Sequence, residues 1–316
     1  GEPIGPFDWL HRRKDDPNDH VDHEERRELR GLKAIAGWIN HFDVKQLNTL
    51  DMYVEEDGKR FVRHHLIDFA STLGGGATGP KAPFGYEYAL DGWAILGRSV
   101  ALGFHEDPWR KLERPPGLDE IGYFESTQYR PHKSKGQYPN SAFANFTDRD
   151  GYWAAKIISA FTDEHLRAVV ATGKYRNPEA EAYMVRMLGE RRDKAARHWF
   201  DRVAPLDYFT LNGSTFEFQD LGEERGLYPG STPRYRVQVA LMNKERKTPA
   251  WSDWIETDTP LVDLGNPGIQ AVVDGSPDSE YPFLAFRLQV NRGEGWSSRV
   301  TVFASRKSGR IVKLAR

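Results

Sequence analysis

The sequence contains no cysteine. Disulfide bonds, thiolate zinc sites and cysteine nucleophiles are therefore excluded. It also has almost no net charge, because 44 Lys and Arg stand against 46 Asp and Glu. A nucleic-acid-binding chain usually carries a clear basic excess, so we expect no nucleic-acid partner. A near-zero net charge is still compatible with local basic patches on the surface.

Long hydrophobic runs are missing as well. The most apolar long stretch, residues 88–104, is interrupted by Asp91 and Arg98, whereas a bilayer span needs about 20 apolar residues. We predict a soluble chain without a transmembrane segment and leave peripheral membrane association open. The chain begins at Gly1 rather than Met, without a basic-then-apolar signal region. We interpret this end as processed or truncated, which favours a periplasmic or extracytoplasmic location over a cytoplasmic one.

The chain does have enough apolar side chains to build cores. Of its 316 residues, 39% are hydrophobic and 12% are aromatic. Domains usually run to about 100–200 residues, so this length predicts two. The segment 1–22 is rich in Pro, Gly, Asp and His and predicts an extended lead-in rather than a packed element. Asp22 and Glu25 then form a capping-box pattern, and helical spacing predicts a helix that ends at Asn40.

Further helices and one hairpin are predicted before residue 204. The turn Glu56-Asp57-Gly58 separates two apolar runs and predicts a β-hairpin. Capping residues and Pro178 mark three helices that should pack together. The hairpin strands lie at 49–54 and 61–69, the three packed helices at 148–161, 162–170 and 177–200, and one more helix at 88–102.

From residue 205 the apolar pattern changes to period two. Short strands at this spacing predict a β-sandwich domain of the immunoglobulin or fibronectin kind. We therefore expect an α+β multidomain protein: an extended lead-in (1–22), a mostly helical domain (23–204) and an all-β sandwich (205–316). The predicted strands are 208–218 around an Asn-Gly turn, 235–242, 251–256, 283–290, 299–304 and 310–314.

One group of residues has the spacing of a catalytic loop. His41, Asp43, Lys45 and Asn48 stand at offsets 0, +2, +4 and +7, and Asp68 ends an apolar strand further along the chain. In kinase-like phosphoryl transfer, one Asp orients the acceptor hydroxyl, and an Asn and a second Asp hold the metal. Magnesium prefers such oxygen ligands. The hairpin between Asn48 and Asp68 should bring the two parts together.

These residues resemble motifs of the protein-kinase-like superfamily. His41-Phe-Asp-Val-Lys-Gln-Leu-Asn48 resembles the HRDxKxxN loop, with Phe42 in place of Arg, and Asp68-Phe69-Ala70 resembles DFG with Ala in place of Gly. The long gap before Asp68 and the leading helix are more similar to the atypical bacterial branch, such as the HipA and CotH kinases. The resemblance covers residues 23 to about 75 and, more loosely, the helices to residue 200, as a C-lobe would.

The resemblance implies a role for each of these residues. Asp43 would be the catalytic Asp, Asn48 and Asp68 the Mg²⁺ ligands, and Lys45 a phosphate contact, with Mg²⁺ and ATP as cofactors. A kinase also needs a glycine-rich loop and a strand lysine paired to a helix glutamate, and neither is found in the sequence before His41. Two hypotheses stay open: a phosphotransferase that acts with an upstream nucleotide lobe, and a non-catalytic pseudokinase-like scaffold or accessory subunit of a larger envelope or membrane-associated complex.

Other features have two interpretations each. The acidic and histidine-rich stretch 15–25 suits either a divalent metal or the positive end of a helix dipole. The charged run 190–194 is typical of a solvated helix face. Trp251, Trp254 and Trp296 form either a sugar-stacking surface or part of a sandwich core. We expect a protein partner or larger assembly to dock through residues 205–316, whose C-terminal end is basic.

Overall fold

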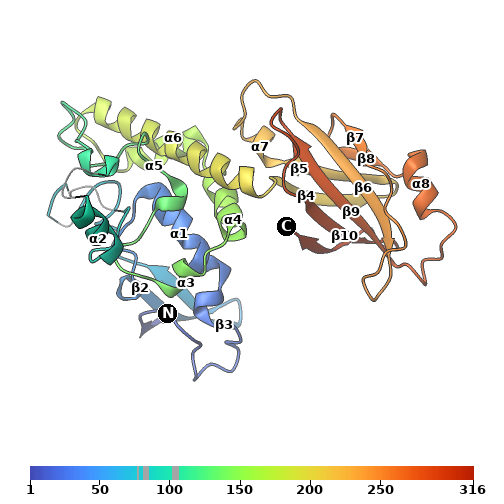
Figure 1. The fold of residues 1–316 in the computed structure, drawn as a ribbon. Helices are drawn as coiled ribbons and strands as arrows, with labels where there is room; N and C mark the ends of the chain where they lie inside the picture. Colours follow the sequence, from blue (N-terminus) through green and yellow to red (C-terminus); the bar gives the residue numbers. More distant parts are fainter. Residues whose placement is uncertain (77, 81–84, 102–106) are drawn as a thin grey trace. The chain divides into compact units, whose positions relative to one another are not determined.

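The computed structural model describes residues 1–76, 78–80, 85–101 and 107–316, which fold into two compact units, Gly1–Ala196 and Arg197–Arg316 (Figure 1). This part of the chain has eight α-helices and three antiparallel sheets. The division falls inside helix α6 (Pro178–Arg202) rather than after residue 204. The last turns of α6 belong to the second unit because Arg197 donates to the carbonyl of Leu227 and Asp201 accepts from Tyr228.

The segment 1–22 is packed, which corrects our expectation of an extended lead-in. Strand β1 (Glu2–Gly5) pairs with strand β2 (Thr49–Glu56). Phe7 and Trp9 are buried in a small core with α1 (Arg27–Ile39), and the Phe7 amide donates to the Thr49 hydroxyl. The apolar side chains placed between the Pro and Gly residues outweigh the turn-forming composition on which the prediction depended.

Helix α1 ends where predicted but does not begin there. It starts at Arg27, after the 3₁₀ turn η1 (His23–Glu25), and Asp22 makes no capping hydrogen bond. The predicted capping box is therefore wrong, because Asp22 instead forms an ion pair with Arg12. Asn40, with a φ of 51°, terminates the helix in the left-handed region.

The predicted hairpin is present. Strand β2 pairs antiparallel with β3 (Lys59–Leu66) from Thr49 opposite Leu66 to Glu56 opposite Lys59. The connecting Asp57 and Gly58 both have positive φ, as a tight two-residue hairpin turn requires. The returning strand stops at Leu66 rather than at residue 69, because Asp68 has a φ of 58°, which is incompatible with a strand.

The helices after residue 140 follow their capping signals. Thr147 and Thr162 each close a capping box, at the start of α4 (Asp148–Ser159) and α5 (Asp163–Ala171). Asn177 accepts a hydrogen bond from the Glu179 amide at the start of α6. Helix α1 packs against α4 and against the short α3 (Ser141–Ala144). No described helix is long and apolar enough to cross a membrane.

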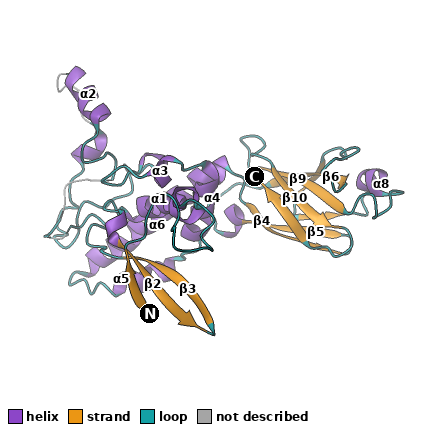
Figure 2. Cartoon of the chain, turned by 90° about the horizontal axis from the view of Figure 1, so that it is seen from below, coloured by secondary structure: helices purple, strands orange, loops and turns teal. Residues whose placement is uncertain are grey.

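Helix α2 (Gly92–Val100) lies within the predicted range 88–102, whose last residue is outside the described part. No residue of α2 is buried, and Figure 2 shows it standing away from α1 and α4. Two ion pairs hold its polar side. Arg98 pairs with Glu87, and Asp91, which precedes the helix, pairs with Lys135. Three further short 3₁₀ turns are η2 (Gln46–Asn48), η3 (Pro108–Lys111) and η4 (Pro131–Lys133).

The second unit consists of two antiparallel sheets over one core. A five-stranded sheet has the order β11-β10-β9-β6-β7 and a three-stranded sheet the order β4-β5-β8. Phe216 of one sheet stacks on Phe286 of the other, with ring centroids 3.9 Å apart. The period-two pattern is confirmed by alternating burial in β6 and β9. Element bounds are β4 Leu206–Asn212, β5 Thr215–Asp220, α7 Leu221–Glu224, β6 Arg234–Met242, β7 Ile255–Thr257, β8 Leu261–Asp263, α8 Pro267–Val273, β9 Phe283–Asn291, β10 Val300–Ser305 and β11 Ile311–Ala315.

Candidate functional site

Three residues of the predicted catalytic loop form one hydrogen-bonded cluster. The Lys45 Nζ lies 2.9 Å from both carboxylate oxygens of Asp43. The Asn48 Nδ2 donates to the main-chain oxygen of Asp43 at 2.9 Å and to its Oδ2 at 3.1 Å. Residues at +2, +4 and +7 from His41 come into contact because turn η2 (Gln46–Asn48) bends the chain back toward Asp43.

The orientation of the Asn48 amide leaves its oxygen available. An amide side chain has two N–H donors on Nδ2 and an acceptor, Oδ1. Both observed contacts of Asn48 use Nδ2 on oxygens of Asp43, so Oδ1 takes no part in them. Asn48 is only 7% exposed, and a buried amide with two defined partners is held in one orientation.

Asp68, the fourth predicted residue, follows the strand that pairs beside this cluster. The Ile67 amide donates to the Asn48 carbonyl at 3.0 Å, continuing the pairing of Thr49 with Leu66. Asp68 follows directly, with a positive φ of 58°. Such a conformation costs a non-glycine residue about 1–3 kcal/mol and is concentrated at functional sites. The strand pairing thus places Asp68 beside the loop that carries Asn48.

His41 contacts the segment that follows Asp68. Its Nδ1 is 3.0 Å from the Thr72 hydroxyl, and its ring centroid is 5.2 Å from that of Phe69. Burial lowers the pKa of His41, and the Ser71 carbonyl and the charges of Asp43 and Asp68 oppose this only in part. Burial thus favours the neutral form of the imidazole, which lies within the electrostatic influence of Asp43 and Asp68.

These donors fit a magnesium ion that also binds a ligand. Mg²⁺ usually takes one or two protein oxygens and completes its shell with phosphates and water. Asn48 Oδ1 and the exposed carboxylate of Asp68 would supply such oxygens. In the part of the chain that is described, no group of three His, Cys, Asp or Glu residues could hold an ion alone.

Arg191 is a site residue that the sequence pattern misassigned. We predicted a solvated face for 190–194, but Arg191 is only 2% exposed. Its guanidinium donates to the carbonyls of Gly37, Trp38 and Glu125 at 2.6–2.7 Å and stacks 3.9 Å from the Tyr129 ring. It thereby binds the last carbonyls of α1, just before the His41 loop. The signal was present in its spacing, since it shares a helical stripe with the buried residues Met184, Leu188 and Ala195.

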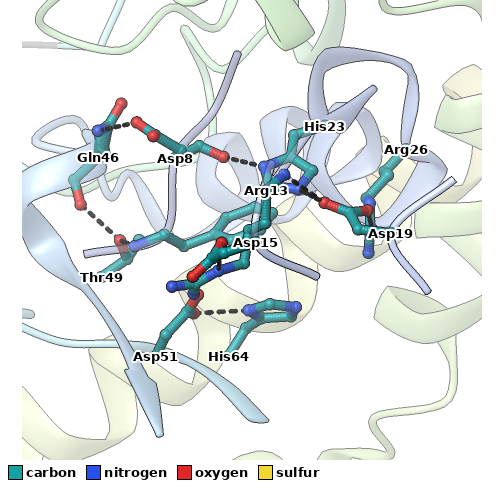
Figure 3. Close-up of polar contacts among 11 residues, drawn as sticks. Asp8, Arg13, Asp15, Asp19, His23, Arg26, Gln46, Thr49, Asp51 and His64 are labelled. Atoms are coloured by element: carbon teal, nitrogen blue, oxygen red, sulfur yellow. Dashed lines mark hydrogen bonds and ion pairs between the residues drawn. The ribbon is translucent and has the colours of Figure 1, made fainter. Parts of the chain in front are cut away.

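The acidic stretch 15–25 forms a network of ion pairs, in which Asp19 contacts His23 and Arg26 (Figure 3). The side chain of the nearby Asp51 is buried, as is that of Asp19, and it contacts Arg13 and His64. The pKa of Asp19 is lowered to about 2 because hydrogen bonds to its carboxylate outweigh the effect of burial. These carboxylates neutralise cations of the protein itself, so neither the metal nor the helix-capping interpretation describes them. His64 belongs to this network through its contact with Asp51.

A pocket of about 770 Å³ lies beside this network. Its lining includes Phe7, Trp9, Leu29, His64 and Leu66, and none of the four kinase-like residues. Pocket and catalytic-loop cluster are therefore separate features of the first unit.

The tryptophans of the second unit stack on arginines. Trp254 and Trp296 lie 4.3 and 4.4 Å from the guanidinium of Arg236, and Trp251 lies 3.7 Å from that of Arg287. All three indoles are half-buried and belong outside the sandwich core. One face of each indole is covered by a cation, which reduces the aromatic surface that sugar stacking needs.

Comparison with protein-family models, with curated proteins and with solved structures found no match to this chain. The kinase-like resemblance therefore stays a prediction, which depends on the motifs and on the contacts among them.

Proposed function

We propose that this chain is a kinase-like phosphotransferase, in which Asp43 orients the acceptor hydroxyl and Asn48 and Asp68 hold Mg²⁺ with ATP. The observation that carries the proposal is the cluster of Asp43, Lys45 and Asn48, to which the Ile67 amide joins the Asp68 segment. The proposal is one of reaction class, with the acceptor left unassigned.

The geometry gives each side chain a task. The Asp43 carboxylate is partly exposed and accepts hydrogen bonds from Lys45, so an incoming hydroxyl would find an oriented acceptor. The Lys45 ammonium, one-third exposed, would neutralise charge on the transferred phosphate. Mg²⁺ bound with the nucleotide supplies charge neutralisation across the phosphates. The proposal assigns the nucleotide base and its glycine-rich cover to a lobe outside these residues.

A second candidate is a pseudokinase-like scaffold. Both Asp43 oxygens already accept from Lys45, and Oδ2 also accepts from Asn48. This closed set of contacts would also stabilise a loop without any turnover. In that case the first unit is a platform, and the chain docks to an assembly through its β unit.

A thermal-shift titration with Mg-ATP separates the two. We expect millimolar Mg-ATP to raise the melting temperature of the wild-type chain and Asp68→Ala to remove the rise, because bound ligand stabilises only the folded state. Asp274→Ala is the matched control, since Asp274 is an exposed Asp of the other unit. Nucleotide binding through this site in the chain by itself is wrong if the wild-type chain shows no rise, or if the rise survives in Asp68→Ala.

A further inference from the structure

The outer face of the five-stranded sheet carries a regular array of polar side chains. Arg236 lies opposite Gln289, and Gln238 opposite Arg287, on β6 and β9. On the other side of β9, Thr301 lies opposite Arg287, and the register places Arg299 beside Gln289. Directly paired residues project to the same face, and alternate residues along each strand share it. Two rows result: Arg236, Gln289 and Arg299 in one, and Gln238, Arg287 and Thr301 in the other.

The arginines of this array are held by aromatic rings. The Arg236 guanidinium lies between Trp254 and Trp296, and the Arg287 guanidinium lies 3.7 Å from the centroid of Trp251. Cation–π contacts fix the plane of a guanidinium without using its N–H donors. The entropy cost of ordering the side chains of Arg236 and Arg287 therefore arises when the protein folds and not when it binds a ligand.

The two held arginines differ in their hydrogen bonds. Nε and Nη2 of Arg236 donate to the Gln289 Oε1. Arg287 has no hydrogen bond and no ion pair to any described residue, so its planar fork of donors is open. Burial and the neighbouring Arg299 lower the pKa of Arg287, as expected for a cation without a counter-ion.

The six residues of the two rows are Arg, Gln and Thr, and Glu256 of β7, which pairs with Arg236, extends the first row with an acid. The Glu256 carboxylate is paired with Arg234. Three arginines thus leave a local positive charge on a flat sheet face, although the whole chain is almost neutral.

We propose that this face binds an acidic, extended segment of a protein partner, with Arg287 as the anchor for a carboxylate. Guanidinium forks bind carboxylates in a bidentate manner. Alternate side chains of an extended segment recur at about 6.8 Å, which is also the spacing of the two rows along the sheet. A guanidinium group already covers one face of each indole, so a sugar polymer has less aromatic surface to stack on here. The proposal is independent of the kinase-like site and names the partner chemistry that the scaffold candidate needs.

Fluorescence anisotropy of the full chain with a fluorescein-labelled short peptide of alternating Glu and Thr tests this. We expect Arg287→Gln combined with Arg299→Gln to weaken the Kd at least about tenfold, because two charge-assisted contacts are lost. Arg299→Gln alone changes an exposed residue and should weaken binding by about threefold without affecting the fold. Arg310→Gln, an exposed arginine of the same unit, is the matched control and should change the Kd less than about twofold.

Three results would overturn the proposal. They are no saturable binding of the peptide, equal loss of affinity in the Arg310→Gln control, and binding that the double substitution leaves unchanged in a chain whose circular dichroism and melting temperature match wild type. Tighter binding of inorganic polyphosphate or heparin than of the peptide would also overturn the assignment to a protein partner. A failed Mg-ATP shift would not affect any of these readouts.

Discussion

The side chain of Asn48 donates to the main-chain oxygen of Asp43 at 2.9 Å and to its carboxylate at 3.1 Å. This double contact fixes the catalytic-loop cluster, because it joins the two ends of the loop. It also directs the amide nitrogen, and not the oxygen, toward Asp43.

Removing the Asn48 amide should weaken both fold and ligand binding. Asn48→Ala leaves the Asp43 carbonyl without this partner, which costs about 1–3 kcal/mol of unfolding free energy. Urea unfolding followed by circular dichroism measures this cost, and the Mg-ATP thermal shift should disappear in the same variant. Leu47→Ala, a neighbouring change at a 72% exposed side chain, is the control and should stay within about 0.5 kcal/mol of wild type.

Arg191 should matter more for stability than the other charged residues of its run. Arg191→Met leaves the carbonyls of Trp38 and Glu125 without a donor and the Gly37 carbonyl with the Asn40 amide alone, so we expect a loss of about 3 kcal/mol in the free energy of unfolding. Arg186→Met, on the exposed side of the same helix, should cost less than about 0.5 kcal/mol. Similar losses in both variants in chemical denaturation would contradict a capping role for Arg191.

The protonation of His41 should make the fold sensitive to mild acid. Its pKa is lowered in the folded chain, chiefly by burial, so below the ordinary value of about 6.5 the unfolded chain binds the proton more readily. Its contribution to stability is complete above that pH and is lost as the pH falls further. Urea unfolding at pH 7.5 and pH 5.5 measures the loss. His41→Gln should reduce the difference between the two pH values, and an equal difference in both proteins would show that other groups cause it.

Gly74 should resist replacement. It has a φ of +76°, and a Cβ there would lie 2.6 Å from the backbone of Tyr123. We expect Gly74→Ala to cost more than about 1 kcal/mol, since both the conformation and the space exclude a side chain. Gly92→Ala, in helix α2 with nothing near the added atom, should be neutral or stabilising. Thermal unfolding of both variants measures the difference. A melting temperature of Gly74→Ala equal to that of wild type would contradict this account.

Local signals made much of the fold predictable. Thr147, Thr162 and the Asp57-Gly58 turn act through neighbours close by in the chain, and the structure confirms each. Period-two alternation predicted most strands of the β unit for the same reason, but it missed β8 and began at 251 a strand that the structure has at Ile255–Thr257. The kinase-like spacing also singled out Asp43, Lys45 and Asn48, which lie in contact in the folded chain.

The sequence by itself determined the hairpin, the capped helices and most strands of the β unit, because capping, turn geometry and periodicity are short-range effects. It did not indicate strand β1, whose pairing with β2 depends on residues more than 40 positions away. Only the tertiary structure decided which polar side chains are buried. Arg191 belongs to a charged run typical of exposed residues, yet carbonyls from distant parts of the chain accept its hydrogen bonds in the interior. Asp51 is likewise buried against Arg13 and His64. The stacking of Arg287 on Trp251 likewise depends on strands and loops that only folding brings together. Burial of a charge becomes favourable when distant groups neutralise it, and no local pattern encodes those distances.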